Sequence, residues 1–171
     1  MATKNPFSFL LYFIPIFCLG TSLYSQYSTE LTVNLNEYTK ELSVRQEFTY
    51  YNSSNYNLGV IYFNDWANAY SDKNTGLAKR FAQEFKKSLH LAKDSERGST
   101  KIISVVDDTY KGLEWNRTEG KDILKVTLNN ILAPGASTKI FITYTVKLPP
   151  NRYTPYGYDP KGDYYLKDWY L

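Results

Sequence analysis

The sequence contains a single histidine, His90, and a single cysteine, Cys18. A zinc-peptidase motif of the H-E-x-x-H type needs two histidines one helical turn apart, so this chain cannot supply one. There is also no G-x-S-x-G turn to present a serine nucleophile and no glycine-rich phosphate loop. The sequence therefore predicts no catalytic residue, no metal site and no cofactor within the chain itself, and we expect the chain alone to be inactive.

An excess of charge of one sign is missing as well. Twenty lysines and arginines stand against 17 aspartates and glutamates, which gives a formal net charge of +3. The lysines are scattered along the chain and form no basic stripe, and this small excess is too weak to argue for a nucleic acid or an anionic membrane as a partner.

The N-terminal residues 1–25 have the layout of a secretory signal peptide, with a lysine near the start, an apolar run over 7–19 and small residues after it. Cleavage after Ser22 and cleavage after Ser25 both fit this layout. A membrane anchor is the alternative, but the run is interrupted by Pro15 and is shorter than the roughly 20 residues that span a bilayer. We expect an exported protein, secreted or periplasmic, that loses Cys18 with the signal and keeps no stable membrane span.

The rest of the chain, residues 26–171, is long enough for one domain with a substantial core. Apolar and polar residues alternate along most of it, which predicts half-buried strands. The strands predicted in this way are an antiparallel hairpin of 31–35 and 42–50, a strand over 60–63 that is apolar on both faces, a strand over 101–106, a pair of 113–115 with 124–128, and a long strand over 140–148.

One segment changes period. Leu77, Phe81, Phe85 and Leu89 recur every four residues, which predicts one amphipathic helix of about four turns over 76–89. The chain is thus predicted to be mainly β, an antiparallel β-sandwich with one inserted amphipathic helix.

Aromatic residues are plentiful, with 17 tyrosines and 3 tryptophans. A tyrosine cluster surrounds the Pro- and Gly-rich loop 151–162 and consists of Tyr153, Tyr156, Tyr158, Tyr164 and Tyr165. Such rings can form a glycan-stacking or protein-binding surface, or they can be buried by ordinary packing, and the sequence leaves both open. The acidic pair Asp107-Asp108 directly follows a predicted strand and is expected to be a solvated turn.

The final residues, Asp163 to Leu171, alternate like a strand and end on Trp169, Tyr170 and Leu171. Such a strand could dock on the sheet of its own domain. We instead expect the sequence to be the front of a longer polypeptide, because chain ends are usually polar and exposed. A partner interface is then predicted at Tyr164, Leu166, Tyr170 and Leu171.

Several segments together resemble the amino-terminal domain of the aminopeptidase N family of zinc metallopeptidases, and most closely its secreted bacterial branch. WANAY at 66–70 and NTGLAKRF at 74–81 carry the resemblance, followed in order by SERG at 95–98, LAPG at 132–135, VKLP at 146–149, Gly157-Tyr158 and Trp169-Tyr170. The likeness covers nearly all of residues 26–171. It implies a β-sandwich saddle that packs on a catalytic domain, which carries the zinc ligands, a glutamate base and a glycine-rich substrate-recognition motif.

None of those catalytic elements is present here, so the resemblance implies two partners outside this chain: a downstream catalytic domain and, in the full-length enzyme with its zinc, a peptide substrate. It also implies a substrate-flanking role for Asp168 and Trp169, near the free amino group of the peptide. Family members often have glutamine before this tryptophan and proline after the next aromatic residue, where this chain has Asp168 and Leu171. An ordinary exposed carboxylate is the other interpretation of Asp168.

Two functions are therefore predicted. The first is a non-catalytic N-terminal domain of a secreted zinc aminopeptidase that flanks the substrate cleft. The alternative is a free-standing secreted β-sandwich binding module, which would use the tyrosine-rich loop to bind a glycan or a protein.

Overall fold

The structure is a computed structural model that describes residues 27–152 and 154–171. The predicted signal peptide with its two cleavage sites, and Tyr153 of the tyrosine cluster, lie outside the described residues. Within the described part of the chain, no helix combines the length and the apolar character needed to cross a bilayer.

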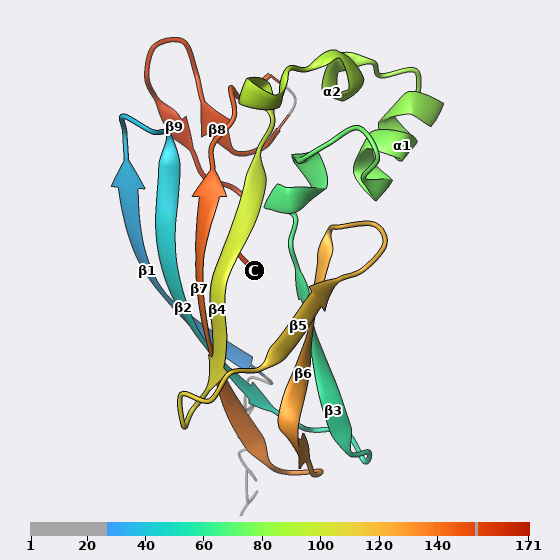
Figure 1. Cartoon of the computed structure of the whole chain (residues 1–171), viewed down its shortest axis with the longest axis vertical. Helices are drawn as coiled ribbons and strands as arrows, with labels where there is room; N and C mark the ends of the chain where they lie inside the picture. The colour runs from blue at the N-terminus through green and yellow to red at the C-terminus, as the bar shows by residue number, and fades with distance from the viewer. Residues whose placement is uncertain (1–26, 153) are drawn as a thin grey trace, which may run out of the picture.

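The larger sheet has four antiparallel strands in the order β1-β2-β7-β4 (Figure 1). Its strands are β1 (Tyr27–Asn36), β2 (Glu41–Tyr51), β7 (Ser137–Lys147) and β4 (Ser99–Asp107). The predicted hairpin is confirmed, with Leu35 opposite Leu42. Its turn is closed by the Asn36 side-chain oxygen, which accepts hydrogen bonds from the backbone N–H groups of Tyr38 and Thr39 at 3.0 and 3.1 Å.

The smaller sheet has three antiparallel strands in the order β3-β6-β5. They are β3 (Leu58–Asn64), β6 (Ile123–Leu132) and β5 (Glu114–Arg117), and Trp115 lies opposite Val126 as the pattern predicts. The prediction that 60–63 is buried on both faces is wrong. β3 is an edge strand in which Ile61 and Phe63 are buried and Tyr62 is 61 % exposed. Tyrosine is favourable in a strand whether its side chain is buried or partly exposed to water.

The core draws on both sheets. The inward side chains of β7 are fully buried, namely Ile140, Ile142, Tyr144 and Val146. Beside them in the same sheet, the ring of Phe48 on β2 meets the ring of Phe63 on β3 of the smaller sheet edge to face, with centroids 4.8 Å apart. The two sheets therefore share one apolar cluster.

The predicted single helix is wrong in its length and number. Residues 76–91 form two short helices, α1 (Gly76–Gln83) and α2 (Ser88–Leu91), flanked by 3-10 turns η1 (Ala67–Tyr70) and η2 (Asp94–Glu96). The start of α1 is conventional, because the Thr75 hydroxyl accepts a hydrogen bond from the Ala78 N–H at 3.2 Å.

The end of α1 explains the error. Phe85 has a φ of 57° and follows the last turn of α1, while its N–H donates to the Ala82 carbonyl at 3.0 Å. The next N–H, from Lys86, donates to the Phe81 carbonyl at 2.8 Å. This pair of bonds is a Schellman motif, which usually has glycine at the left-handed position. With phenylalanine there, the sequence carries no stop signal and its four-residue period continues unbroken.

The C-terminal residues also differ from the prediction of a strand over 163–171. Only Tyr164–Tyr165 (β9) is paired, with Gly157–Tyr158 (β8), and no strand continues after it. Asp168 has a φ of 52°, a left-handed conformation that no strand accommodates. The chain then turns inward, and Figure 1 shows its C-terminal end between the two sheets.

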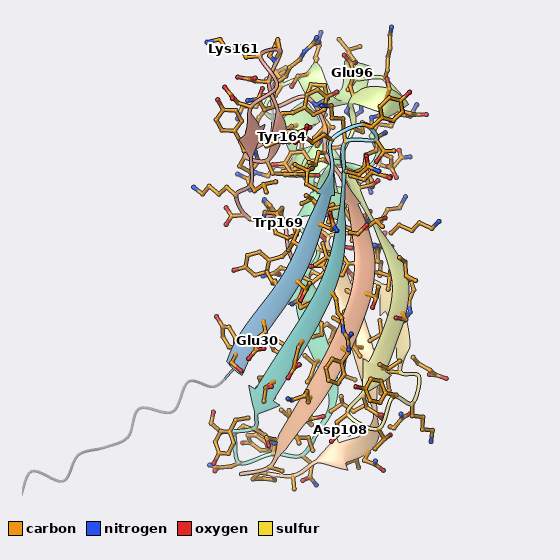
Figure 2. All side chains as sticks on the ribbon, turned by 90° about the vertical axis from the view of Figure 1, so that its left-hand side faces the viewer. Glu30, Glu96, Asp108, Lys161, Tyr164 and Trp169 are labelled. Carbon is orange, nitrogen blue, oxygen red and sulfur yellow. The ribbon has the colours of Figure 1, made fainter. Side chains whose placement is uncertain are left out.

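The link from β4 to β5 joins one edge of each sheet, at the opposite end of the molecule from Tyr164 and Lys161 (Figure 2). The Asp107 carboxylate organises this link. Its oxygens accept hydrogen bonds from the Thr109 hydroxyl at 2.6 Å, from the Thr109 and Lys111 N–H groups at 3.0 Å each, and from the Asn129 amide at 2.9 Å. Asp107 is thus a turn-forming carboxylate, as expected of the Asp107-Asp108 pair.

These hydrogen bonds predict how stability depends on pH. They lower the pKa of Asp107 from 3.8 to about 2, the Thr109 hydroxyl contributing most and the Asn129 amide next. Because the folded-state pKa lies below the unfolded one, the stabilisation is present above about pH 4 and is lost as the pH falls toward 2. We expect Asp107→Asn to lose less unfolding free energy than the unsubstituted chain across that window, measured by urea denaturation.

Asp108→Asn is the matched control, since Asp108 lies next to Asp107 on the same link. Equal acid sensitivity of the two variants would contradict the role of Asp107.

Candidate functional site

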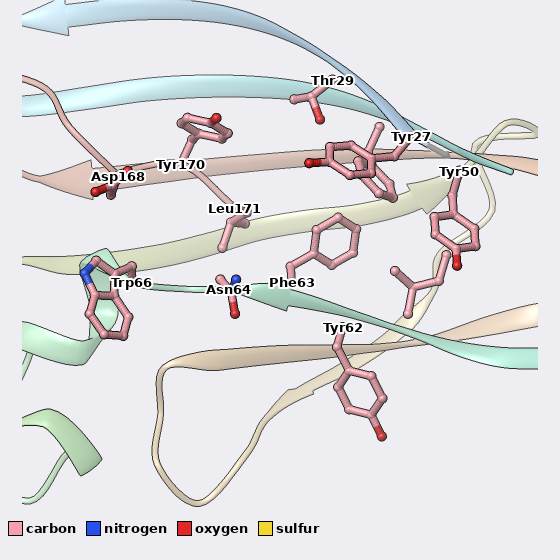
Figure 3. A pocket seen from close by; sticks show the side chains of 12 residues that line it. Tyr27, Thr29, Tyr50, Tyr62, Phe63, Asn64, Trp66, Asp168, Tyr170 and Leu171 are labelled. Atoms are coloured by element: carbon pink, nitrogen blue, oxygen red, sulfur yellow. The ribbon is translucent and has the colours of Figure 1, made fainter. Parts of the chain in front are cut away.

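An open groove of about 850 Å³ runs between the β1–β2 edge of the larger sheet and the β3 edge of the smaller one (Figure 3). It is rich in aromatic rings. Its lining residues are Tyr27, Thr29, Phe48, Tyr50, Ile61, Tyr62, Phe63, Asn64, Trp66, Asp168, Tyr170 and Leu171.

The groove lies beside the edge strands β1 and β3 of the two sheets. The β4–β5 link ties the far edges together, whereas β1 and β3 each end their own sheet. The C-terminal residues enter from the open side. Trp66 and Asp168 lie at one end of the groove, and Tyr27 and Tyr50 lie toward the other (Figure 3).

A buried polar contact fastens the chain end inside the groove. Gln46 on β2 and Tyr144 on β7 are fully buried. The Tyr144 hydroxyl donates to the Gln46 side-chain oxygen at 2.8 Å and accepts from the Leu171 N–H at 3.4 Å. The Gln46 amide in turn donates to the Leu171 backbone oxygen at 2.5 Å. Burial raises the pKa of Tyr144, so its proton stays in place to make this bond.

The two predicted substrate-flanking residues occupy different environments. Trp169 is only 8 % exposed and belongs to the core, where its ring meets that of Tyr170 edge to face at 5.8 Å. Asp168 is exposed and lines the groove. Its carboxylate lies close enough to Tyr70 to raise the pKa of that hydroxyl, after the larger effect of burial. Trp169 thus anchors the segment, and Asp168 presents a charge.

The predicted interface residues are divided as well. Leu166 and Tyr170 are exposed, whereas Tyr164 and Leu171 are half-buried against the core. Within this group, Tyr170 and Leu171 line the groove.

The groove end at Trp66 is held by an ion pair that the sequence did not reveal. The Asp65 carboxylate is fully buried, and the Arg117 guanidinium reaches it with an Nε···Oδ2 distance of 2.8 Å. The same guanidinium donates to the Thr100 carbonyl at 2.8 Å. Burial raises the pKa of Asp65, and Arg117 opposes that rise. An aspartate directly after an apolar strand segment was the available signal, but its partner is 52 residues away.

The turn that follows Asp65 is fixed by neighbouring bonds. The Asn68 amide donates to the Lys121 carbonyl at 2.7 Å, and the Asp65 N–H donates to the Asp122 carbonyl at 2.8 Å. The Tyr156 hydroxyl donates to the Ala67 carbonyl at 2.9 Å. These contacts hold η1 against the end of both sheets.

The tyrosine cluster is mostly engaged in packing. Tyr156 is fully buried, and the half-buried rings of Tyr158 and Tyr164 hold the Lys40 ammonium, which lies 5.2 and 5.1 Å from their centroids. Lys40 also donates to the Tyr164 hydroxyl at 2.7 Å. Of the cluster members that the structure describes, Tyr165 is the one classed as exposed. The described rings therefore do not form one continuous surface.

The described part of the chain does not fit a zinc site. Among the described residues, no group of three or more histidines, cysteines, aspartates or glutamates is placed to hold a metal ion. His90 lies in α2, exposed, and belongs to no such group. No catalytic step through zinc can be derived from these residues.

In comparisons with known proteins, the chain matches no family model and no curated protein sequence.

Removal of one hydroxyl should test the fastening of the chain end. Tyr144→Phe leaves the Gln46 oxygen and the Leu171 N–H without their partner, so we expect unfolding free energy to fall by about 1–3 kcal/mol. Hydrogen exchange should quicken at residues 169–171. Tyr38→Phe is the control, because Tyr38 is almost fully exposed; an effect of equal size there would contradict the assignment.

Removal of the buried cation should be more damaging. Arg117→Met leaves Asp65 charged and buried, so unfolding free energy at neutral pH is expected to fall by roughly 3 kcal/mol. The deficit should shrink in acid, because a raised folded-state pKa favours the protonated, more stable form at low pH. Adding Asp65→Asn should restore part of the loss.

The matched control is Arg80→Met, which removes an exposed surface pair with Glu84 and should change stability by less than about 1 kcal/mol. Similar losses in the Arg80 and Arg117 variants would contradict a special role for the buried pair.

Proposed function

We propose that this chain is the non-catalytic N-terminal domain of an exported zinc aminopeptidase, secreted or periplasmic, and that it walls one side of the peptide cleft. One observation carries the proposal. Two segments that bear the family resemblance, WANAY at 66–70 and the terminal Trp169-Tyr170, are about 100 residues apart in sequence, yet they meet at the same groove through Trp66 and Tyr170.

The proposed architecture is an open β-sandwich, the saddle of that family. Its support is the shared core and the Phe48–Phe63 ring contact between the sheets. Sheets that pack face to face interdigitate their inner side chains in this way. The open side of the saddle is then the groove side, where β1 and β3 are the outermost of the described strands in their sheets.

Asp168 is the acid among the residues that line the groove, and it is proposed to attract the free ammonium group of a peptide. Its left-handed backbone supports this role, because residues in sparsely populated conformations are often found at functional sites. Trp169 would act indirectly, by anchoring the turn that presents Asp168. The zinc ligands and the glutamate base would belong to the catalytic domain outside this chain.

Distinct behaviour is expected of the chain and of the full-length polypeptide. The chain alone should hydrolyse no aminoacyl substrate in the presence of zinc, and detectable hydrolysis by a pure sample would refute the non-catalytic role.

In the full-length polypeptide, Asp168→Asn should lower kcat/KM for peptides with a free amino group by on the order of 10-fold, since one charge–charge attraction is lost.

The control variant is Asp163→Asn, an exposed acid in the nearby β8–β9 hairpin, which should leave kcat/KM unchanged. Equal effects of the two substitutions would contradict the placement of Asp168 at the substrate ammonium.

A further inference from the structure

The helical insert, residues 76–93, exposes two large apolar side chains within seven residues. Phe85 is 87 % exposed between α1 and α2, and Leu91 is 77 % exposed at the end of α2. Leu89 is fully buried, so it fixes α2 to the domain while Leu91 faces outward. Figure 1 shows α1 and α2 together at one corner of the molecule, away from the strands of the larger sheet.

The backbone conformation and the exposure of Phe85 are both unfavourable for the stability of the fold. Its left-handed conformation disfavours every residue with a bulky side chain. The exposed ring also gains nothing from burial in this chain. A rule of local structure broken without compensation is most often found at functional positions.

Basic residues are concentrated in the insert, on both sides of Phe85 in the sequence. The insert contains five of them, Lys79, Arg80, Lys86, Lys87 and Lys93, all exposed, against the single acid Glu84. The insert therefore has a net charge of +4. The whole chain has a net charge of +3, so the rest of the chain has a net charge of −1. The near balance of the whole sequence conceals this concentration.

The one acid is already matched. Arg80 Nε lies 3.0 Å from one Glu84 carboxylate oxygen, and Lys86 Nζ lies 2.7 Å from the other. Lys86, the residue that follows Phe85, is one of the two cations in these ion pairs. Phe85 is thus an exposed aromatic side chain that basic residues flank in the sequence.

We propose that the helical insert is a peripheral docking surface for an anionic lipid membrane, with Phe85 and Leu91 entering the interface and the lysines meeting the headgroups. Exposed apolar side chains combined with lysines are the combination that binds to such interfaces. An acidic protein would satisfy the lysines but would need a matching pocket for a lone protruding ring. This surface is separate from the groove and does not depend on the proposed peptidase role.

A tryptophan reporter tests the proposal at the site itself. The Phe85→Trp variant is mixed with vesicles of equal parts phosphatidylglycerol and phosphatidylcholine, and with vesicles of phosphatidylcholine alone. We expect the added fluorescence to shift to shorter wavelength with the anionic vesicles only. Tyr38→Trp places the reporter at an exposed turn outside the insert and should not shift. Equal shifts of both reporters, or no shift in the Phe85→Trp variant, overturn the proposal.

Two further variants separate the apolar and the electrostatic contributions. Phe85→Asn removes the ring while suiting the left-handed turn, so folding stability should hold or rise while the partition coefficient falls about 10-fold. Lys79→Gln with Lys87→Gln should weaken partitioning roughly 25-fold, about fivefold for each charge.

The charge control is Lys101→Gln with Lys111→Gln, two exposed lysines outside the insert, which should have little effect. Equal losses in the two lysine pairs would overturn the assignment of the surface. Retention on immobilised polyglutamate without vesicle binding would also overturn it and would favour an acidic protein partner.

Discussion

The buried contact between Asp65 and Arg117 is the constraint on which the arrangement of this domain depends. A carboxylate with no exposed surface can remain charged only beside a cation, and Arg117 provides one at 2.8 Å. Asp65 directly follows β3 and Arg117 ends β5, which are the two outer strands of the smaller sheet. Arg117 also donates to the Thr100 carbonyl on β4 of the larger sheet. One guanidinium therefore joins both sheets at the end where η1 begins, next to Trp66 in the sequence.

The second constraint is the fastening of the chain end by Gln46 and Tyr144. Both side chains are buried polar groups, and each satisfies the other and the backbone of Leu171. Trp169 is buried as well, and the backbone turns just before it, at the left-handed Asp168. The exposed carboxylate at the groove is thus a consequence of two buried anchors.

Much of the fold follows from the sequence because half-buried strands alternate with period two. The β1–β2 hairpin and the long strand β7 are confirmed for that reason. Phe85 could not reveal the end of α1, since it occupies a position where glycine would have been the signal. Trp169 and Leu171 give the same apolar pattern whether they form a strand or fill a groove. The Asp65–Arg117 pair and the groove depend on the tertiary arrangement of distant segments, which no local pattern contains.

The proposed role of this domain is to serve a catalytic domain encoded with it. The most direct measurement is the coding DNA beyond the codon for Leu171. We predict an open reading frame that continues into H-E-x-x-H with a further glutamate downstream, the ligand set of a zinc peptidase. A stop codon at that point, with no peptidase frame adjoining it, would contradict the claim.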